Sequence, residues 1–152
     1  MCALGEAVGG AGRSEVDARQ LVRACYFGPL GERPFGANRG TDYNAGIADK
    51  AAYYREANEQ MLACALLEDV AVLDNLDAIL SVPGIDLYSI GPNDFAQSLG
   101  YPGQPDHPEI VKTMQEITRR IGQAGRRMQL DVMQGAWVSD MLLDAGRRIL
   151  SS

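Results

Sequence analysis

The chain has 152 residues, a size typical of one domain with a core of its own. Its hydrophobic content of 46% and charged content of 22% are those of an ordinary globular protein and exclude a low-complexity or disordered chain. The formal net charge of -6 argues against a surface for nucleic acid or anionic membranes, which requires clustered Lys and Arg.

Cysteine usage and the apolar runs predict a cytoplasmic location. Cys2, Cys25 and Cys64 are widely spaced and contain no CxxC pair, so we expect neither a zinc site nor a disulfide framework. The longest apolar runs fall short of the ~18 residues that a membrane span needs. The first residues have no basic start, which argues against a signal peptide. We therefore expect a cytoplasmic protein that binds neither membranes nor nucleic acid.

The first half of the chain predicts two helices, a long loop between them, and a strand. Ser14 begins a capping-box-like pattern, and an apolar stripe of helical period follows it. Residues 28–46 contain five glycines and two prolines, which indicates an irregular loop. A second helix is predicted over residues 49–60. The apolar run 61–67 then ends at Glu68, as a buried strand would.

The second half alternates between helical and strand patterns. Apolar residues three and four positions apart predict one helix closed by Pro83-Gly84 and another that begins near Pro108. In chain order the expected elements are a helix at 72–80, a strand at 85–90, a helix at 108–121, a strand at 128–132, and a short strand at Val138 followed by a helix. This alternation predicts βα units on a parallel sheet.

Two acidic residues follow neighbouring strands of this predicted sheet. Glu68 comes directly after the first strand, and Asp94 follows the second behind the dipeptide Gly91-Pro92. Their offset of 26 positions is close to one βα unit of a (β/α)8 barrel, which takes about 31 residues. Both side chains are therefore expected at the carboxyl edge of the sheet, where parallel α/β proteins bind ligands.

Two interpretations of these acids remain open from the spacing alone. Hard divalent cations such as Mg²⁺ prefer one or two carboxylates, with substrate and water completing the shell. Gly91 lets backbone approach a ligand, Pro92 stiffens the corner, and the N–H groups of Asn93 and Asp94 could hold a substrate carboxylate. The alternative is structural, since acidic residues after strands are commonly helix N-caps.

Residues 75–110, NLDAILSVPGIDLYSIGPNDFAQSLGYPGQPDHPEI, closely resemble the HpcH/HpaI aldolase/citrate lyase family, the metal-dependent 2-oxo-acid aldolases. Residues 18–36, ARQLVRACYFGPLGERPFG, are similar to an upstream family segment. The resemblance implies a (β/α)8 barrel, assembly into homo-oligomers, and a divalent Mg²⁺, Mn²⁺ or Co²⁺ that binds pyruvate and stabilises its enolate. It implies Glu68 and Asp94 as metal ligands, and Gly91, Pro92 and Asn93 as the substrate-binding backbone.

The resemblance also implies that the chain is part of a barrel. A complete barrel takes about 250 residues, and the match begins near the fourth strand. We therefore expect a single truncated domain over residues 1–152, roughly strands 4–8 with their helices. The family's catalytic His and substrate-binding Arg would fall in the missing N-terminal part, so the catalytic residues stay unknown. His107 lies at a helix start, where capping is expected rather than acid–base chemistry.

The function implied by the resemblance is a class II carbon–carbon lyase. It would cleave a 4-hydroxy-2-oxo acid to pyruvate, or a related 2-oxo acid, and an aldehyde. One alternative is a catalytically incompetent fragment that acts as a metal- and pyruvate-binding or oligomerising module, because the strand edges of an open half-barrel invite pairing with another chain. Another alternative is an unstable relic without cooperative unfolding.

Overall fold

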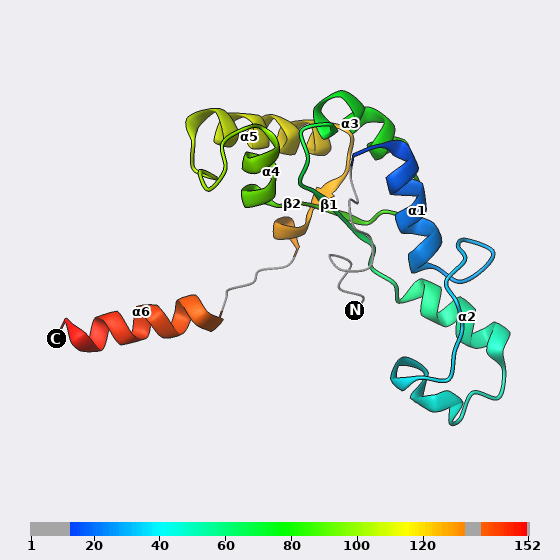
Figure 1. The fold of residues 1–152 in the computed structure, drawn as a ribbon. Helices are drawn as coiled ribbons and strands as arrows, with labels where there is room; N and C mark the ends of the chain where they lie inside the picture. Colours follow the sequence, from blue (N-terminus) through cyan, green and yellow to red (C-terminus); the bar gives the residue numbers. More distant parts are fainter. Residues whose placement is uncertain (1–12, 133–137, 152) are drawn as a thin grey trace.

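A computed structural model of the chain describes residues 13–132 and 138–151 (Figure 1). A small parallel sheet lies at the centre of the fold, with helices packed against it. The predicted α/β class is therefore confirmed. Cys2, one of the three cysteines discussed above, lies outside the described residues.

Three strands form the sheet in the described part of the chain. They are β1 (Cys64–Leu67), β2 (Leu87–Ile90) and β3 (Arg127–Met128), in the order β1-β2-β3 with both neighbouring pairs parallel. The register pairs Leu67 at the end of β1 with Ile90 at the end of β2. Since all the strands run the same way, the residues that follow Leu67 and Ile90 emerge side by side at one edge.

The described residues contain six α-helices and two short 3-10 helices. The α-helices are α1 (Glu15–Cys25), α2 (Lys50–Glu59), α3 (Val72–Ser81), α4 (Pro92–Ser98), α5 (Pro108–Gln123) and α6 (Val138–Leu150), and the 3-10 helices are η1 (Arg39–Asn44) and η2 (Gln129–Asp131). The first, second, third and fifth of these α-helices lie within a few residues of their predicted positions. Within the described ranges, no helix is both long and apolar enough to cross a membrane.

Side-chain caps explain where the first two helices begin. The Ser14 hydroxyl accepts the N–H of Asp17 at 3.3 Å, as the capping-box pattern predicts. The Asp49 carboxylate accepts the N–H groups of Ala51 and Ala52 at 2.8 and 3.1 Å. A cap of this kind stabilises a helix by about 1 kcal/mol because it satisfies N–H groups that lack an intrahelical partner.

The core lies between the sheet and the apolar faces of α1, α3 and α5. Its largest fully buried side chains include Leu21, Leu67, Leu76, Ile79, Tyr88, Phe95, Ile110, Ile117 and Ile121. The helical members recur at the three- and four-residue spacing that the sequence showed. Burying each Leu or Ile contributes roughly 1.5–3 kcal/mol, so this core fixes β1 and β2, the strands that precede the two acids.

Helix α2 and the loop after α1 form an aromatic arm away from the sheet (Figure 1). None of the residues of α2 is fully buried. The ring of Tyr54 instead stacks on Phe27, with centroids 4.4 Å apart and planes 6° apart. Asn58 binds the backbone of Phe27, because its side-chain amide accepts the Phe27 N–H at 2.8 Å and donates to the Phe27 carbonyl at 3.0 Å. These contacts hold α2 to the loop.

The structure corrects two of the predicted strands. The short strand at Val138 is wrong, because Val138 is the first residue of α6, whose apolar residues follow a helical period that overrides one β-branched side chain. The strand at 128–132 is also largely wrong, since β3 ends at Met128 and η2 follows it. The described part thus holds three strands, where the sequence patterns predicted four and the family resemblance implied roughly strands 4–8.

Helix α4 is the α-helix of the described part that the sequence analysis did not predict. The dipeptide Gly91-Pro92 was expected to be a stiff corner, but Gly91 is the N-cap of α4 and Pro92 is its first residue. Proline suits that position because its missing N–H has no helical partner there and its φ is already helical. Asp94 therefore lies in the first turn of a helix.

Candidate metal and substrate site

Glu68 and Gly91 are neighbours at the carboxyl edge of the sheet. Glu68 follows Leu67, the last residue of β1, and Gly91 follows Ile90, the last residue of β2. The Gly91 N–H donates to the Leu67 carbonyl at 3.1 Å, which continues the β1–β2 ladder by one step. The parallel register thus places Glu68 beside the N-cap of α4.

Gly91 leaves room for the Glu68 side chain. A methyl carbon built on Gly91 would lie 3.2 Å from both Cβ and Oε2 of Glu68, closer than nearly all real contacts of this kind. The backbone of Gly91 is in an ordinary extended conformation, so glycine is needed here for space and not for an unusual φ. The Glu68 side chain therefore packs tightly against the backbone of Gly91.

Helix α4 turns Asp94 toward the segment that carries Glu68. Asp94 and Ser98 are four residues apart and so lie on the same face of the helix, about one turn apart. The Ser98 hydroxyl accepts the N–H of Val70 at 2.9 Å, and Val70 lies two residues after Glu68. The helix face that bears Asp94 is therefore in contact with the loop that follows β1.

The electrostatics of Glu68 indicate that the two acids lie close together. Partial burial raises the pKa of the Glu68 carboxyl, and the negative charge of Asp94 raises that pKa further. The positive charge of Arg13 acts in the opposite direction. A like-charge effect on a pKa requires the two carboxyl groups to be near each other. Two acids in this arrangement attract a cation.

Arg13 and Asp69 flank Glu68, and the sequence analysis assigned neither. The Arg13 Nε lies 3.0 Å from Oδ2 of Asp69, and the other carboxylate oxygen of Asp69 accepts the N–H of Ala71 at 2.9 Å. Asp69 thus orders the loop between β1 and α3. An Asp shortly before a predicted helix, here Asp69, was a sequence signal for the turn before α3. No sequence signal indicated that Arg13 would lie near Glu68.

The interpretation of the two acids as helix N-caps does not fit this geometry. Ala71 is the N-cap of α3, so Glu68 lies outside that helix, and Gly91 is the N-cap of α4. Asp94 is in the first turn of α4, where its charge interacts favourably with the helix dipole, but it is not the capping residue.

The residues present fit a divalent cation held in an open site. Two carboxylates are the protein ligands that Mg²⁺ typically takes, with substrate and water supplying the other oxygens. Among the described residues, no three His, Cys, Asp or Glu side chains gather as a closed metal cage would require. Asp94 is exposed and Glu68 is half-buried, so a small ligand can reach both.

His107 lies at the start of α5, as the sequence predicted, and acts as its N-cap. Its Nδ1 accepts the N–H of Glu109 at 3.3 Å. The imidazole also stacks on Tyr101, with ring centroids 4.1 Å apart, and the Tyr101 hydroxyl donates to the Glu109 carboxylate. These contacts give His107 a structural role at the start of α5.

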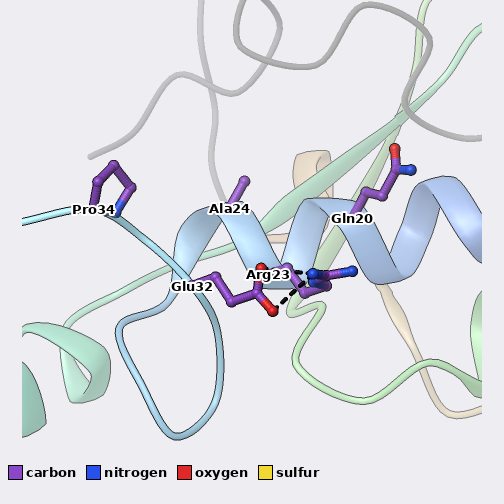
Figure 2. A pocket seen from close by; sticks show the side chains of 5 residues that line it. All are labelled: Gln20, Arg23, Ala24, Glu32 and Pro34. Carbon is purple, nitrogen blue, oxygen red and sulfur yellow. Dashed lines mark hydrogen bonds and ion pairs between the residues drawn. The ribbon is translucent and has the colours of Figure 1, made fainter.

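A shallow pocket lies at the opposite end of α1 from the acids. Figure 2 shows this cavity of about 300 Å³, lined by Gln20, Arg23, Ala24, Glu32 and Pro34. An exposed ion pair of 2.6 Å between Arg23 and Glu32 lines it. Arg23 is in the last turn of α1, whereas Arg13 precedes the first turn on the side of Glu68. The pocket therefore does not belong to the carboxylate site.

Comparisons with known proteins agree on the family. A model of the HpcH/HpaI aldolase/citrate lyase family matches residues 13–148. The 2-keto-3-deoxy-L-rhamnonate aldolase of Salmonella paratyphi B is 41% identical over 109 residues, which make up 72% of this chain and 40% of that protein. The chain thus spans about 40% of the length of this curated relative.

Solved structures give the same result. The HpcH/HpaI aldolase from Desulfitobacterium hafniense superposes with a TM-score of 0.65 at 28% identity, over 89% of this chain and 51% of that one. An HpcH/HpaI aldolase/citrate lyase family protein from Burkholderia cenocepacia superposes with a TM-score of 0.64 at 28% identity, over 75% of this chain and 45% of that one. With the matching sequence motifs and the parallel sheet, these findings show that the chain belongs to the HpcH/HpaI aldolase/citrate lyase family.

Proposed function

We propose that this chain carries the metal- and substrate-binding edge of a class II 2-oxo-acid aldolase, in a partial (β/α)8 barrel. The reaction is the reversible cleavage of a 4-hydroxy-2-oxo acid to pyruvate, or a related 2-oxo acid, and an aldehyde. The observation that carries this proposal is the packing of Glu68 against Gly91, with Asp94 close enough to raise the pKa of Glu68. Family membership supplies the reaction class.

Each residue has a distinct task in this proposal. Glu68, at the end of β1, and Asp94, in the first turn of α4, hold a divalent ion, Mg²⁺, Mn²⁺ or Co²⁺. When bound, the ion supplies Lewis-acid polarisation of the 2-oxo group and offsets the negative charge of the pyruvate enolate. The backbone of Gly91, Pro92 and Asn93 lies beside the substrate carboxylate. The first N–H groups of α4, among them that of Asn93, lack intrahelical acceptors and can donate to an anion.

The substrate is proposed to be a 2-oxo acid that carries a hydroxyl group on carbon 4. The curated relative is named for 2-keto-3-deoxy-L-rhamnonate, which has this arrangement of groups. The aldehyde partner is not fixed by the residues at the sheet edge. No motif of this sequence matches the acid–base His or the substrate-binding Arg that the family resemblance implies, so the catalytic proton transfer is not assigned to a residue.

Turnover with different metals tests the proposal. A 4-hydroxy-2-oxo acid is incubated with the chain and Mg²⁺, Mn²⁺ or Co²⁺, and pyruvate release is measured. We expect Glu68→Gln and Asp94→Asn to abolish metal-dependent turnover and to weaken Mn²⁺ binding, while Asp106→Asn, which removes an exposed carboxylate in the loop before α5, changes neither. Equal activity and equal Mn²⁺ affinity in Glu68→Gln and the unaltered chain would end the ligand assignment.

A second candidate is a metal- and pyruvate-binding module without catalysis. The observation that favours it is the pair of acids itself, because Glu68 and Asp94 can hold a divalent ion with its pyruvate ligand without an acid–base residue beside them. Isothermal titration calorimetry separates the two candidates. Binding of pyruvate that depends on Mg²⁺, without aldol cleavage, supports the module, whereas turnover supports the enzyme.

We also propose that the chain forms homo-oligomers in the cytoplasm. Several apolar side chains of α6 are exposed, among them Leu142 at 68% and Leu150 at 90%. Large apolar side chains gathered on one exposed helix often mark a surface that another chain covers. Light scattering across a concentration series measures the oligomeric state, and a mass that stays monomeric at all concentrations contradicts the proposal.

A further inference from the structure

Ser98 connects the two segments that carry the proposed metal ligands. Its hydroxyl accepts the N–H of Val70 at 2.9 Å and donates to the carbonyl of Phe95 at 2.8 Å. The first bond crosses from α4 to the loop after β1, and the second fixes the direction of the hydroxyl. Because Phe95 is fully buried, the carbonyl that orients Ser98 belongs to a residue anchored in the core.

The loop that Ser98 holds is also restrained on its other sides. Asp69 bonds the backbone of Ala71 and pairs with Arg13 at the start of α1. The Gly91 N–H holds the end of β1 through the Leu67 carbonyl. These contacts fix the loop to the sheet, to α1 and to itself. The bond from Val70 to Ser98 fixes it to the last turn of α4, one turn beyond Asp94.

We propose that Ser98 is a positioning residue for the metal site, an inference that rests on the proposed function of Glu68 and Asp94. Ser98 sets the distance between the two carboxylates by tying their segments together. It acts through the backbone of Val70 and through α4, without contact to metal or substrate. Partners that orient metal ligands typically change metal affinity by 10- to 100-fold when they are removed.

Ser81 provides a matched control for Ser98. It is an exposed serine in the last turn of α3, and its hydroxyl donates to the carbonyl of Ala78, three residues earlier, at 2.7 Å. Ser98 makes the same kind of bond to Phe95 in the last turn of α4. The two serines therefore differ in the bond that Ser98 accepts from Val70, which isolates the effect of that bond.

The experiment measures Mn²⁺ binding to the full 152-residue chain by electron paramagnetic resonance, with Mn²⁺ alone as the probe. We expect Ser98→Ala to weaken Mn²⁺ binding roughly tenfold, at the lower end of the range for such partners. Ser98→Thr keeps a hydroxyl and should therefore retain most of the Mn²⁺ affinity of the unaltered chain. Ser81→Ala should bind Mn²⁺ as the unaltered chain does. Amide exchange at Val70 should become faster in Ser98→Ala and not in Ser81→Ala.

Two results would overturn this inference in distinguishable ways. If Glu68→Gln loses Mn²⁺ binding while Ser98→Ala keeps the affinity of the unaltered chain, the metal site stands and Ser98 has no positioning role. If Glu68→Gln binds Mn²⁺ as well as the unaltered chain, or neither binds it, the proposed metal site is wrong and the role of Ser98 falls with it. Thermal unfolding of the metal-free variants shows whether Ser98→Ala is folded. If Ser98→Ala is misfolded, its loss of Mn²⁺ affinity comes from misfolding and counts against the inference.

Discussion

At the scale of single residues, the site depends on a carboxylate side chain that packs closely against a glycine. Glu68 is partly buried, lies against Gly91 and is affected by the charge of Asp94. The sequence predicted the positions of both acids from their places after strands. It did not predict the contact between Glu68 and Gly91, because a contact between side chain and backbone across two strands depends on the register.

Replacing Glu68 by Gln should stabilise the metal-free chain at neutral pH. The pKa of Glu68 is raised in the folded state, so the stability linked to its protonated form is present below the ordinary pKa of about 4.5 and is lost as pH rises through the folded value. The gain in Glu68→Gln should stay below about 1 kcal/mol because solvent screens a half-exposed carboxyl. Urea unfolding at pH 4 and pH 7 checks this. A gain that is equal at both pH values contradicts it.

Replacing Gly91 by Ala should damage metal binding more than folding. The added methyl group meets Cβ and Oε2 of Glu68 at 3.2 Å, so the Glu68 side chain must shift by a few tenths of an ångström, whereas the backbone of Gly91 accepts alanine without strain. We expect Mn²⁺ affinity to fall about tenfold or more, with a change in unfolding free energy below about 1 kcal/mol.

Gly122→Ala is the control for the substitution of Gly91. A methyl carbon on Gly122 meets no atom within 4 Å, and the residue lies in the last turn of α5. This variant should gain up to about 1 kcal/mol of stability from helix propensity and leave Mn²⁺ binding unchanged. Normal Mn²⁺ affinity in Gly91→Ala would mean that Glu68 does not need the space.

At the scale of elements, the sequence predicted long periodic helices well and short elements poorly. Helices α3 and α5 have caps or breakers and an apolar stripe, so their positions followed from the pattern. Helix α4 has seven residues, too few for a clear stripe, and its start at Pro92 was interpreted as a corner. The strand at Val138 was predicted from one β-branched residue, although the residues after it follow a helical period.

Replacing Asn58 by Ala should loosen α2 without affecting the metal site. Asn58 makes two hydrogen bonds to the Phe27 backbone, and their loss leaves the buried Phe27 N–H without this acceptor, while the Phe27 carbonyl keeps its bond from the Gly31 N–H at 3.2 Å. We expect a local destabilisation of about 1–3 kcal/mol, seen as faster hydrogen exchange over residues 50–59. Asn75→Ala, which loses one bond within α3, should leave this exchange unchanged. Hydrogen exchange over residues 50–59 that stays slow in Asn58→Ala would show that the aromatic contacts alone hold α2 to the loop.

At the scale of the molecule, the two faces of the sheet are covered unequally. In β1, Ala65 and Leu67 are buried, while Cys64 and Leu66 are half-buried. Helices α1, α3 and α5 cover the face that carries Ala65 and Leu67, and their apolar side chains form the core with these residues. The alternation of strands and helices in the sequence was sufficient to predict the parallel sheet, because each periodicity is local. The reaction class required the family resemblance, because two acids at strand ends are compatible with many ligands.

Alkaline pH should destabilise the whole molecule through Tyr26. Its hydroxyl lies 3.0 Å from the Gly84 carbonyl and 3.2 Å from the Asp86 carboxylate, and burial, followed by the charge of Asp86, raises its pKa from 10 to about 12. Protonated Tyr26 therefore contributes stability that is complete below pH 10 and is lost as pH rises from 10 to about 12.

Unfolding of Tyr26→Phe measures this contribution. The variant should be less stable by about 1 kcal/mol at pH 8, because it lacks the hydroxyl hydrogen bond, and the difference should shrink or reverse above pH 10. Tyr43→Phe removes a hydroxyl from a side chain that is 66% exposed and should not alter the loss of stability between pH 10 and about 12. A difference between Tyr26→Phe and the unaltered chain that is constant with pH contradicts the prediction.

The ladder between β1 and β2 sets which changes of length the site can survive. Successive side chains of a strand point to opposite faces, so a single residue inserted within residues 64–67 would swing Glu68 to the other side of the sheet. The loop at residues 99–107 lies between α4 and α5, downstream of both acids, and extra residues there would leave their orientation intact. Among natural and engineered homologues, deletions and insertions should therefore be confined to such loops and excluded from the two strands.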